Sequence, residues 1–497
     1  MRAESTKILR TLEIAVVVLL TWGTAATAQT WQALSNPSPI NAGAMLLLTD
    51  GRVLVHSESS NSQIWYALKP DINGSYVNGT WAQVASLPPG YSPLYFASAV
   101  LPDGRVIVEG GEYNSLSQVW TNLGAIYDPT SNTWTSVAPP SGWSNIGDAQ
   151  SVVLANGQFM LANSLTKEQA LLNATTLTWT STGTGKFDVN DEEGWTLLPD
   201  GNVLTVDAYV FQYDAAGTNS EIYNTSTGTW SSAGSTVVQL WDSAAACSGP
   251  SFEVGPAVLQ PDGTVFATGA NRCAGGHTAI YNPGAGTWTA GPDFSDTLDI
   301  ADGPAALEPN GNVIMMTSPG IFQTGAMFFE WNGSTLTPIT GPPNASFDSS
   351  YYGHFLELPT GQLLFTDFSL DVEVFTPSGT YNTAWAPTIT NAPKGVSRSP
   401  KKAYVISGTQ FNGLSQGAAY GDNFQNATNY PLVRITNNGT GHVFYARTHN
   451  HSTMAIATGS TVVSTHFNVP AGAEKGASTL EVVVNGIASA PVPITVH

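Results

Sequence analysis

The chain has 497 residues, enough for two or three domains, and a formal net charge of −20. Such an excess of acid argues against a nucleic-acid surface, because phosphate binding needs clustered Lys and Arg. It suits a protein that attracts cations. Charged residues are few and Gly is abundant, a composition typical of turn-rich all-β proteins.

The first 28 residues have the pattern of an export signal. A basic start is followed by a short apolar run at 14–20 and by an Ala-Thr-Ala cleavage site at 26–28. The apolar run is too short to span a bilayer. We therefore expect a signal peptide over 1–28 and a secreted or extracytoplasmic protein. It should be a monomer that has no membrane span and does not bind nucleic acid.

A hairpin signal recurs along the chain. At 99–111 the sequence reads AVLPDGRVIVEGG, in which one apolar run enters an Asp-Gly turn and a second leaves it. Such a dipeptide favours a two-residue type I′ turn, which needs positive φ at both central residues. Seven copies occur, and their turn dipeptides begin at Asp50, Asp103, Asn156, Asp200, Asp262, Asn310 and, in weakened form, Thr360.

Most copies are followed by a second hairpin with an aromatic strand, a polar turn and a Trp. In three of them a Tyr precedes the Trp by seven residues, in the pairs Tyr127–Trp134, Tyr223–Trp230 and Tyr281–Trp288. Two hairpins per repeat make a four-stranded unit, and a period of about fifty residues is in the kelch range. We predict a seven-bladed β-propeller over 29–387, closed by pairing of strand 30–35 with the last blade. The alternative is a run of unrelated sandwich hairpins.

After Pro387 the pattern changes to short alternating strands. Seven of them, including STMAIATG at 452–459, occur in about 95 residues, which is typical of an immunoglobulin-like sandwich. The predicted fold class is therefore all-β, a seven-bladed kelch-type β-propeller followed by an immunoglobulin-like β-sandwich at 388–497.

The sequence contains two cysteines, Cys247 and Cys273. They flank the predicted hairpin around Asp262, and an exported protein meets oxidising conditions, so we expect a disulfide between them. A reactive thiol is the alternative.

Acids recur at one position of the repeat. The first strand of each blade lines the channel of a propeller, so residues about eight positions before the turn edge one mouth. Four blades offer carboxylates there: Asp148, Glu192 or Glu193, Glu253 and Asp302. Converging carboxylates bind a hard cation such as calcium, or raise one another's pKa. The alternative is a set of solvated or locally hydrogen-bonded acids.

Histidines form a second group. His449 and His451 are one residue apart in a predicted strand, so both side chains point the same way. Such a pair can bind a transition metal, and His442 and His466 belong to the same domain. An ordinary surface pair is the alternative.

The repeats and the C-terminal strands resemble the galactose-oxidase-like family over nearly all of 30–497. The resemblance implies a copper-radical oxidase of primary alcohols or aldehydes. In that family a Tyr is crosslinked to a Cys and covered by a stacked aromatic residue. A second Tyr, followed directly by a His, and another His from a C-terminal loop complete the copper site.

The resemblance places these roles on particular residues. The stretch YFASAVLPDGRVIVEGGEY puts Tyr95 at the crosslinked Tyr and Tyr113 at the stacking aromatic residue. SSYYGHFLELPTG puts Tyr351 at the second Tyr, and RTHNHSTM puts His449 at the C-terminal His. The candidate metal ligands are thus Tyr95, Tyr351, His354 and His449, with Tyr95 and Tyr351 as candidate catalytic residues.

Two features of the family pattern are missing. Ala42 stands where the crosslinking Cys is expected, and Tyr352 follows Tyr351 in place of a His, although His354 is near. The thioether eases oxidation of the Tyr, so its loss argues against a stable radical.

Three functions follow from these patterns. The leading hypothesis is an exported propeller that binds a glycan or an extracellular surface partner at an acidic, tyrosine-lined mouth, with a degenerate copper site. The rival is a copper-dependent oxidase that makes hydrogen peroxide, and the third is a structural exported protein. Copper and calcium are the cofactors to test.

Overall fold

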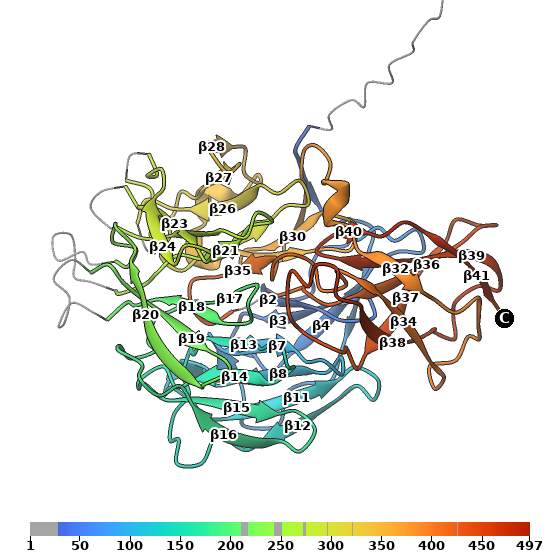
Figure 1. Cartoon of the computed structure of the whole chain (residues 1–497), viewed down its shortest axis with the longest axis horizontal. Helices are drawn as coiled ribbons and strands as arrows, with labels where there is room; N and C mark the ends of the chain where they lie inside the picture. Colours follow the sequence, from blue (N-terminus) through green and yellow to red (C-terminus); the bar gives the residue numbers. More distant parts are fainter. Residues whose placement is uncertain are drawn as a thin grey trace, which may run out of the picture.

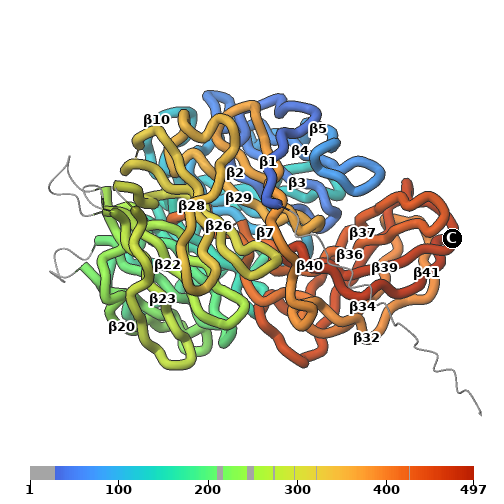
Figure 2. Tube along the Cα trace, turned by 90° about the horizontal axis from the view of Figure 1, so that it is seen from above, coloured from blue at the N-terminus to red at the C-terminus, as the bar shows by residue number. Residues whose placement is uncertain are grey.

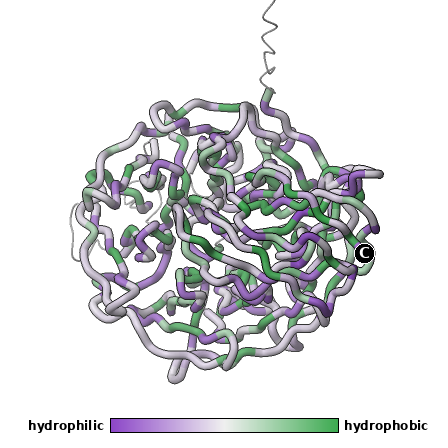
Figure 3. Tube along the Cα trace, turned by 45° about the vertical axis from the view of Figure 1, so that its right-hand side comes forward, coloured by the Kyte–Doolittle hydropathy of each residue, from purple (hydrophilic) through white to green (hydrophobic). Residues whose placement is uncertain are grey.

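The computed structural model describes residues 28–209, 217–242, 251–271, 275–295, 297–320, 322–424 and 426–497. The predicted signal peptide, apart from its last residue, and both Cys247 and Cys273 lie outside the described residues. The described chain is almost entirely β, with short 3₁₀ turns at Ala345–Phe347, Ser350–Tyr352 and Thr383–Trp385. No helix in these ranges is long and apolar enough to cross a membrane. Figure 3 shows hydrophobic and hydrophilic residues alternating along the chain.

Seven antiparallel sheets follow one another in the described chain; six have four strands, and the sixth has a fifth strand added from the C-terminal part. Figure 1 shows how these sheets are arranged. The first contains β2 (Ala42–Leu47), β3 (Val53–Ser57), β4 (Trp65–Lys69) and β5 (Thr80–Gln83). The second contains β7 (Ala97–Val100), β8 (Val106–Glu109), β11 (Gly124–Asp128) and β12 (Thr133–Val137). The third contains β13 (Ser151–Val153), β14 (Phe159–Ala162), β15 (Gln169–Asn173) and β16 (Thr178–Thr182).

The series continues to the seventh sheet, which includes the first strand of the described chain. The fourth contains β17 (Trp195–Leu197), β18 (Val203–Val206), β19 (Asn219–Asn224) and β20 (Thr229–Ser235). The fifth contains β21 (Ala257–Leu259), β22 (Val265–Thr268), β23 (Thr278–Asn282) and β24 (Thr287–Ala290). The sixth contains β25 (Ala305–Leu307), β26 (Val313–Thr317), β27 (Met327–Trp331) and β28 (Leu336–Ile339). The seventh contains β29 (His354–Glu357), β30 (Leu363–Thr366), β31 (Glu373–Thr376) and β1 (Thr30–Ala33).

The first strands of these sheets contact one another in a closed order. The contacts run β2, β7, β13, β17, β21, β25, β29 and back to β2. The predicted closing strand is confirmed, because β1 pairs with β31 and sets Trp31 opposite Phe375. This arrangement is consistent with a β-propeller. A small separate sheet contains β6 (Pro93–Leu94), β9 (Tyr113–Asn114) and β10 (Ser117–Gln118). In the sequence, β6 precedes β7, and β9 and β10 lie between β8 and β11.

The hairpin turns differ from the predicted type. Each turn Gly has φ between 79° and 95°, but the Asp, Asn or Thr before it is not in the left-handed region. In the first sheet Gly51 N donates to Leu48 O (2.9 Å) and Leu48 N donates to Arg52 O (2.7 Å). The loop therefore has three residues, a type I turn closed by a glycine bulge, and the two-residue type I′ prediction is wrong. The glycine is needed because only one residue takes the left-handed conformation.

The Tyr–Trp pairs form the contact between the two outer strands. Tyr127 faces Trp134 across β11 and β12, with ring centroids 5.1 Å apart. Trp134 Nε1 also donates to Ala85 O of the preceding connection (2.8 Å), and Trp179 does the same to Ala138 O (2.8 Å). Each Trp thus joins neighbouring sheets, which explains why it recurs once per repeat.

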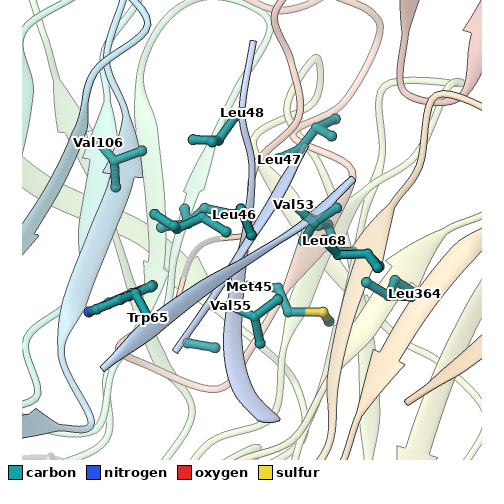
Figure 4. Packing of buried hydrophobic residues seen from close by; sticks show 14 of the residues in the cluster. Met45, Leu46, Leu47, Leu48, Val53, Val55, Trp65, Leu68, Val106 and Leu364 are labelled. Atoms are coloured by element: carbon teal, nitrogen blue, oxygen red, sulfur yellow. The ribbon is translucent and has the colours of Figure 1, made fainter. Parts of the chain in front are cut away.

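Apolar side chains fill the space between sheets. Figure 4 shows Met45, Leu46, Val55 and Trp65 of the first sheet packed among Val106 and Leu364 of its neighbours. All the residues of β2 and β3 are buried, so these inner strands lack the alternation of apolar and polar residues seen in half-exposed strands.

The C-terminal strands form a lobe beside the ring of sheets (Figure 2). Its nine strands are β32 (Thr388–Asn391), β33 (Gly395–Val396), β34 (Ala403–Thr409), β36 (Leu432–Asn437), β37 (Val443–His449), β38 (Val463–Asn468), β39 (Gly476–Val484), β40 (Ile487–Ala488) and β41 (Val492–Val496). The predicted strand at 452–459 is wrong. Met454 N instead donates to Ala155 O (3.0 Å), and Ile456 packs into the core of the ring, which explains the alternating apolar pattern.

One segment of the C-terminal part runs between the first strands of the ring, and we call residues 412–429 the axial segment. Its strand β35 (Ala418–Ala419) pairs with β25 of the sixth sheet. Phe424 bridges to Ser98 of the second sheet, and Asn426 Nδ2 donates to Phe355 O of the seventh (2.8 Å). On the fourth sheet, Leu197 N donates to Gln416 Oε1 (2.7 Å). The axial segment therefore touches the ring from inside.

Candidate functional site

Five carboxylates from five segments meet where the first strands begin. Asp148, Glu192, Glu253 and Asp302 precede the first strands of the third to sixth sheets, and Asp422 belongs to the axial segment. One oxygen each of Asp148, Glu192 and Asp422 lie within 4.8 Å of one another. The same holds for Glu192, Glu253 and Asp302. Glu192 therefore belongs to both groups, and we call the five acids the mouth cluster.

The backbone at the rim is locally uncommon. Tyr95, Glu192 and Asp302 each stand nine residues before the Gly of their hairpin turn, and their φ values are 53°, 59° and 46°. A non-glycine residue rarely adopts this left-handed conformation, which persists only where the surrounding structure holds it. The same position of three repeats thus turns a carboxylate or a phenol towards the end of the ring.

The axial segment closes the cluster from the centre. A Cβ on Gly421 would lie 2.6 Å from Asp302 Oδ1, so the segment needs a glycine to approach the rim this closely. Tyr420 Oη donates to Tyr351 O (2.7 Å) in the 3₁₀ turn that precedes the seventh sheet. These contacts place Asp422 among acids that are distant in the sequence.

Several oxygens of the mouth cluster are buried without a hydrogen-bond partner. The exposed fraction is 3% for Asp422 and 8% for both Asp148 and Glu253. Oδ1 of Asp148, Asp302 and Asp422 and Oε2 of Glu253 receive no hydrogen bond among the described residues, apart from the protons that the Glu253 carboxyl group can share with Glu192 and Asp302. Burying a polar group without a partner costs free energy of about 1–3 kcal/mol, and a charged one costs more. Some group must compensate these oxygens.

The electrostatics of the cluster are unfavourable to its own negative charge. Burial, and next the charge of Glu253, raises the pKa of Glu192 well above its usual range. Burial, and next the charge of Asp302, does the same to the pKa of Glu253 and of Asp422. Burial raises the pKa of Asp302 to about 7.

Asp148 follows the same rule, since burial and then the charge of Asp191 raise its pKa. Among the described residues, no Lys or Arg is one of the groups that act most strongly on the pKa values of the five acids. The five acids therefore need protons or an external cation to neutralise them.

Glu193, which the sequence offered as an alternative to Glu192, does not face the mouth cluster. Its Oε1 lies 2.8 Å from Lys186 Nζ, and the same ammonium contacts Asp207 (3.2 Å) and Glu221 (2.6 Å). The left-handed backbone of Glu192 (φ 59°) turns its side chain away from that of Glu193, so the two residues enter different clusters. The placement of Glu193 at the mouth is corrected.

The tyrosines of the predicted site lie at the same end of the ring. Tyr95 and Tyr113 meet edge to face, with ring centroids 6.0 Å apart. Burial raises the pKa of Tyr95, and the charges of Glu58, Tyr351 and Asp302 contribute. Burial also raises the pKa of Tyr351, to which Asp302 adds. Tyr95 and Tyr351 thus lie at the same end of the ring as the mouth cluster, ahead of β7 and β29, and both are within electrostatic range of Asp302.

The two predicted imidazole ligands lie apart. His354 is fully buried, its ring is stacked on Tyr420 with centroids 5.0 Å apart, and burial lowers its pKa to about 3. His449 lies on β37 opposite His466 of β38. Two residues before it, Arg447 donates through Nη2 to Asp103 O (2.8 Å) in the turn that follows β7.

Tyr95 precedes β7, so His449 and Tyr95 lie at opposite ends of that strand. The structure therefore does not bring His449 to Tyr95 and Tyr351. The register of β37 with β38 fixes His449 there, and the axial segment, not the RTHNHSTM stretch, is what reaches the mouth. Asp422 was missed by the sequence reasoning. The sequence feature that could have pointed to it is the length of segment 411–429, which is long for a loop between two sandwich strands.

The donor set does not fit the copper site that the resemblance implies. Ala42 occupies the Cys position and is fully buried, Tyr352 follows Tyr351, and His449 is elsewhere. The atoms that converge are carboxylate oxygens, which suit calcium, magnesium or manganese better than copper.

Comparisons with known proteins agree with a propeller. No family model matches the chain. A stretch of 130 residues is 28% identical to Kelch-like protein terF of Aspergillus terreus, which corresponds to 25% of this chain and 26% of that protein. The chain thus aligns with about a quarter of this curated relative, which supports a kelch or propeller type of fold.

Two solved structures resemble the chain more loosely. A fungal alcohol oxidase of the AA5 family, solved in complex with copper, has a TM-score of 0.49 at 13% identity and covers 95% of this chain and 99% of its own. Virginiamycin B lyase from Staphylococcus aureus has a TM-score of 0.48 at 9% identity, and the alignment covers 70% of this chain and 100% of the lyase chain.

Proposed function

We propose that this protein is an exported seven-bladed kelch-type propeller, with an immunoglobulin-like C-terminal domain, that binds a glycan through a calcium-class cation at its acidic mouth. The closed series of four-stranded sheets and the kelch relative support the architecture. The nine-stranded lobe with its own apolar core supports a separate C-terminal domain.

One observation carries the cation. Five buried or half-buried carboxylates of distant sequence meet around Glu192, and four of them present an oxygen without a partner. Calcium takes six to eight oxygen ligands at about 2.3–2.6 Å and tolerates irregular geometry, so it can use such a set. Its charge also removes the repulsion that the cluster otherwise carries.

The surroundings of the cluster favour a polyhydroxylated ligand. A cation at the rim has coordination positions left for hydroxyl groups. At the same end of the ring, Phe322 is 56% exposed and meets Tyr351 edge to face with centroids 5.2 Å apart, and Tyr352 and Phe368 extend this group of aromatic rings. An apolar ring surface next to a few polar groups is typical of a small-molecule site. A sugar ring offers both an apolar face and hydroxyls.

The test compares two neighbouring residues. Calcium binding to the chelator-treated full chain is measured by titration calorimetry, and glycan binding on an array with and without calcium. Glu192→Gln should weaken calcium binding by at least about tenfold, because affinity follows the ligand charge, whereas the matched Glu193→Gln should bind calcium as the wild type does. Glycan binding should need calcium. Wild-type protein that binds neither calcium nor any glycan contradicts the proposal.

A further inference from the structure

We infer that the mouth cluster holds two cations that share the carboxylate of Glu192. The inference rests on the proposed cation site and assigns its nuclearity and ligands. Glu192, Asp148 and Asp422 hold the first cation, and Glu192, Glu253 and Asp302 hold the second.

The spacing of the acids separates two centres. Two oxygens bound to one calcium at about 2.3–2.6 Å cannot be more than about 5 Å apart. Within each triad the oxygens meet this limit, since all lie within 4.8 Å of one another. The five acids do not form one such set among the described residues, and the triads have only Glu192 in common. With the side chains as they lie, one cation therefore reaches the three carboxylates of one triad and not all five.

Each triad points to a ligand of its own. In the first, Asp422 is 97% buried, and Oδ1 of both Asp422 and Asp148 has no partner. In the second, Glu253 is more than nine-tenths buried, and its Oε2 has no partner. One cation would leave one of these two sets of buried oxygens uncompensated, at the cost that any unpaired buried charge carries.

Charge gives the same count. One divalent cation neutralises two of the five carboxylates, and two neutralise four. A carboxylate has two oxygens and can bind two metals at once, as bridging ligands of two-metal sites do. Glu192 stands between the triads, and its left-handed backbone (φ 59°) fixes the side chain there.

The first cation also links two parts of the chain. Asp148 belongs to the ring and Asp422 to the axial segment, so their shared cation joins the C-terminal part to the third and fourth sheets. The second cation touches the ring alone, through the fourth, fifth and sixth sheets. The two cations should therefore be separable by substitution.

The experiment counts cations per chain. Chelator-treated full chain is titrated with calcium by calorimetry, and bound manganese is counted by elemental analysis after gel filtration. Wild type and Glu193→Gln should bind two. Asp422→Asn and Glu253→Gln should each retain one, and Glu192→Gln should lose at least about tenfold in affinity at both.

Controls separate a loss of cation binding from a loss of folding. Circular dichroism and a thermal melt check folding of each variant, and Asp148→Asn or Asp302→Asn replaces a variant that does not fold. A wild type that binds one cation, weakened alike by Asp422→Asn and Glu253→Gln, overturns the two-cation site but leaves the proposed function standing. A wild type that binds none overturns both.

Discussion

Two clusters of buried acids lie on either side of one peptide, and they are neutralised differently. Glu193 joins Asp207 and Glu221 around the Lys186 ammonium, whose side chain is fully buried. Glu192, the preceding residue, joins Asp148, Glu253, Asp302 and Asp422. Among the described residues, the first cluster has a cation built into the chain, and no Lys or Arg acts strongly on the second.

The difference shows what each cluster is for. A lysine gives a permanent counter-charge, fixed by packing, and makes the Lys186 cluster part of the framework. The mouth cluster has more carboxylates, and at the same end of the ring the exposed ring of Phe322 contacts Tyr351. An arrangement that relies on an outside cation can also bind and release one, which suits a ligand site.

The largest expected effect on stability comes from removing the Lys186 ammonium. Lys186→Met leaves three carboxylates buried without a counter-charge, so the free energy of unfolding should fall by about 3–5 kcal/mol. Urea denaturation followed by Trp fluorescence measures it. A loss below about 1 kcal/mol would show that the ammonium is not what holds Glu193, Asp207 and Glu221.

Glu357 is a buried acid outside both clusters, and we expect a bound proton to neutralise it. Glu357 Oε2 accepts hydrogen bonds from Thr428 and Asn485 (both 2.9 Å), and burial raises its pKa to about 7. A folded-state pKa above the unfolded value near 4.3 means that stability is lost as pH rises through about 7.

Glu357→Gln should remove this loss. The wild type should become less stable than the variant by up to about 3 kcal/mol between pH 5 and 8, since one pKa unit corresponds to about 1.36 kcal/mol. Denaturant titrations of both proteins at four pH values measure the difference. Equal pH dependence of the two would contradict a neutral Glu357.

Calcium should stabilise the mouth and not the Lys186 cluster. At a concentration about one hundred times the dissociation constant, a ligand that binds only the folded state adds about 2.7 kcal/mol per site. The melting temperature of the wild type and of Glu193→Gln should therefore rise with calcium, whereas that of Glu192→Gln should rise clearly less. A rise of equal size in Glu192→Gln would place the cation elsewhere.

The smallest expected effect is the best control. Glu193→Gln removes a negative charge that faces Lys186, and Glu193 is not among the groups that act most strongly on the pKa of Glu192, so calcium affinity should change by less than about threefold. Calorimetry measures it. A tenfold loss would mean that the two clusters act as one.

Much of the fold follows from local patterns. The turn glycines, the Tyr–Trp pairs and the closing strand are set by short-range chemistry, namely a left-handed residue, a cross-strand contact and an unpaired sheet edge. The type of turn was not predictable from the dipeptide, because Asp-Gly also fits a three-residue loop with a glycine bulge.

The site was predictable only in part. The repeat position points to Asp148, Glu253 and Asp302, but it cannot separate Glu192 from Glu193, because a left-handed residue changes which one faces the rim. Asp422 depends on the axial segment, which has no periodic pattern. His449 was misplaced because a matching motif carries no information on which end of the ring its strand reaches.

The most direct test of the central claim is a crystal structure of the full chain grown with manganese, with anomalous differences recorded at the manganese edge. We predict anomalous density between Glu192 and its neighbouring carboxylates, as two peaks on either side of the Glu192 side chain. Ordered carboxylates without anomalous density, held by shared protons alone, would contradict a cation site at the mouth.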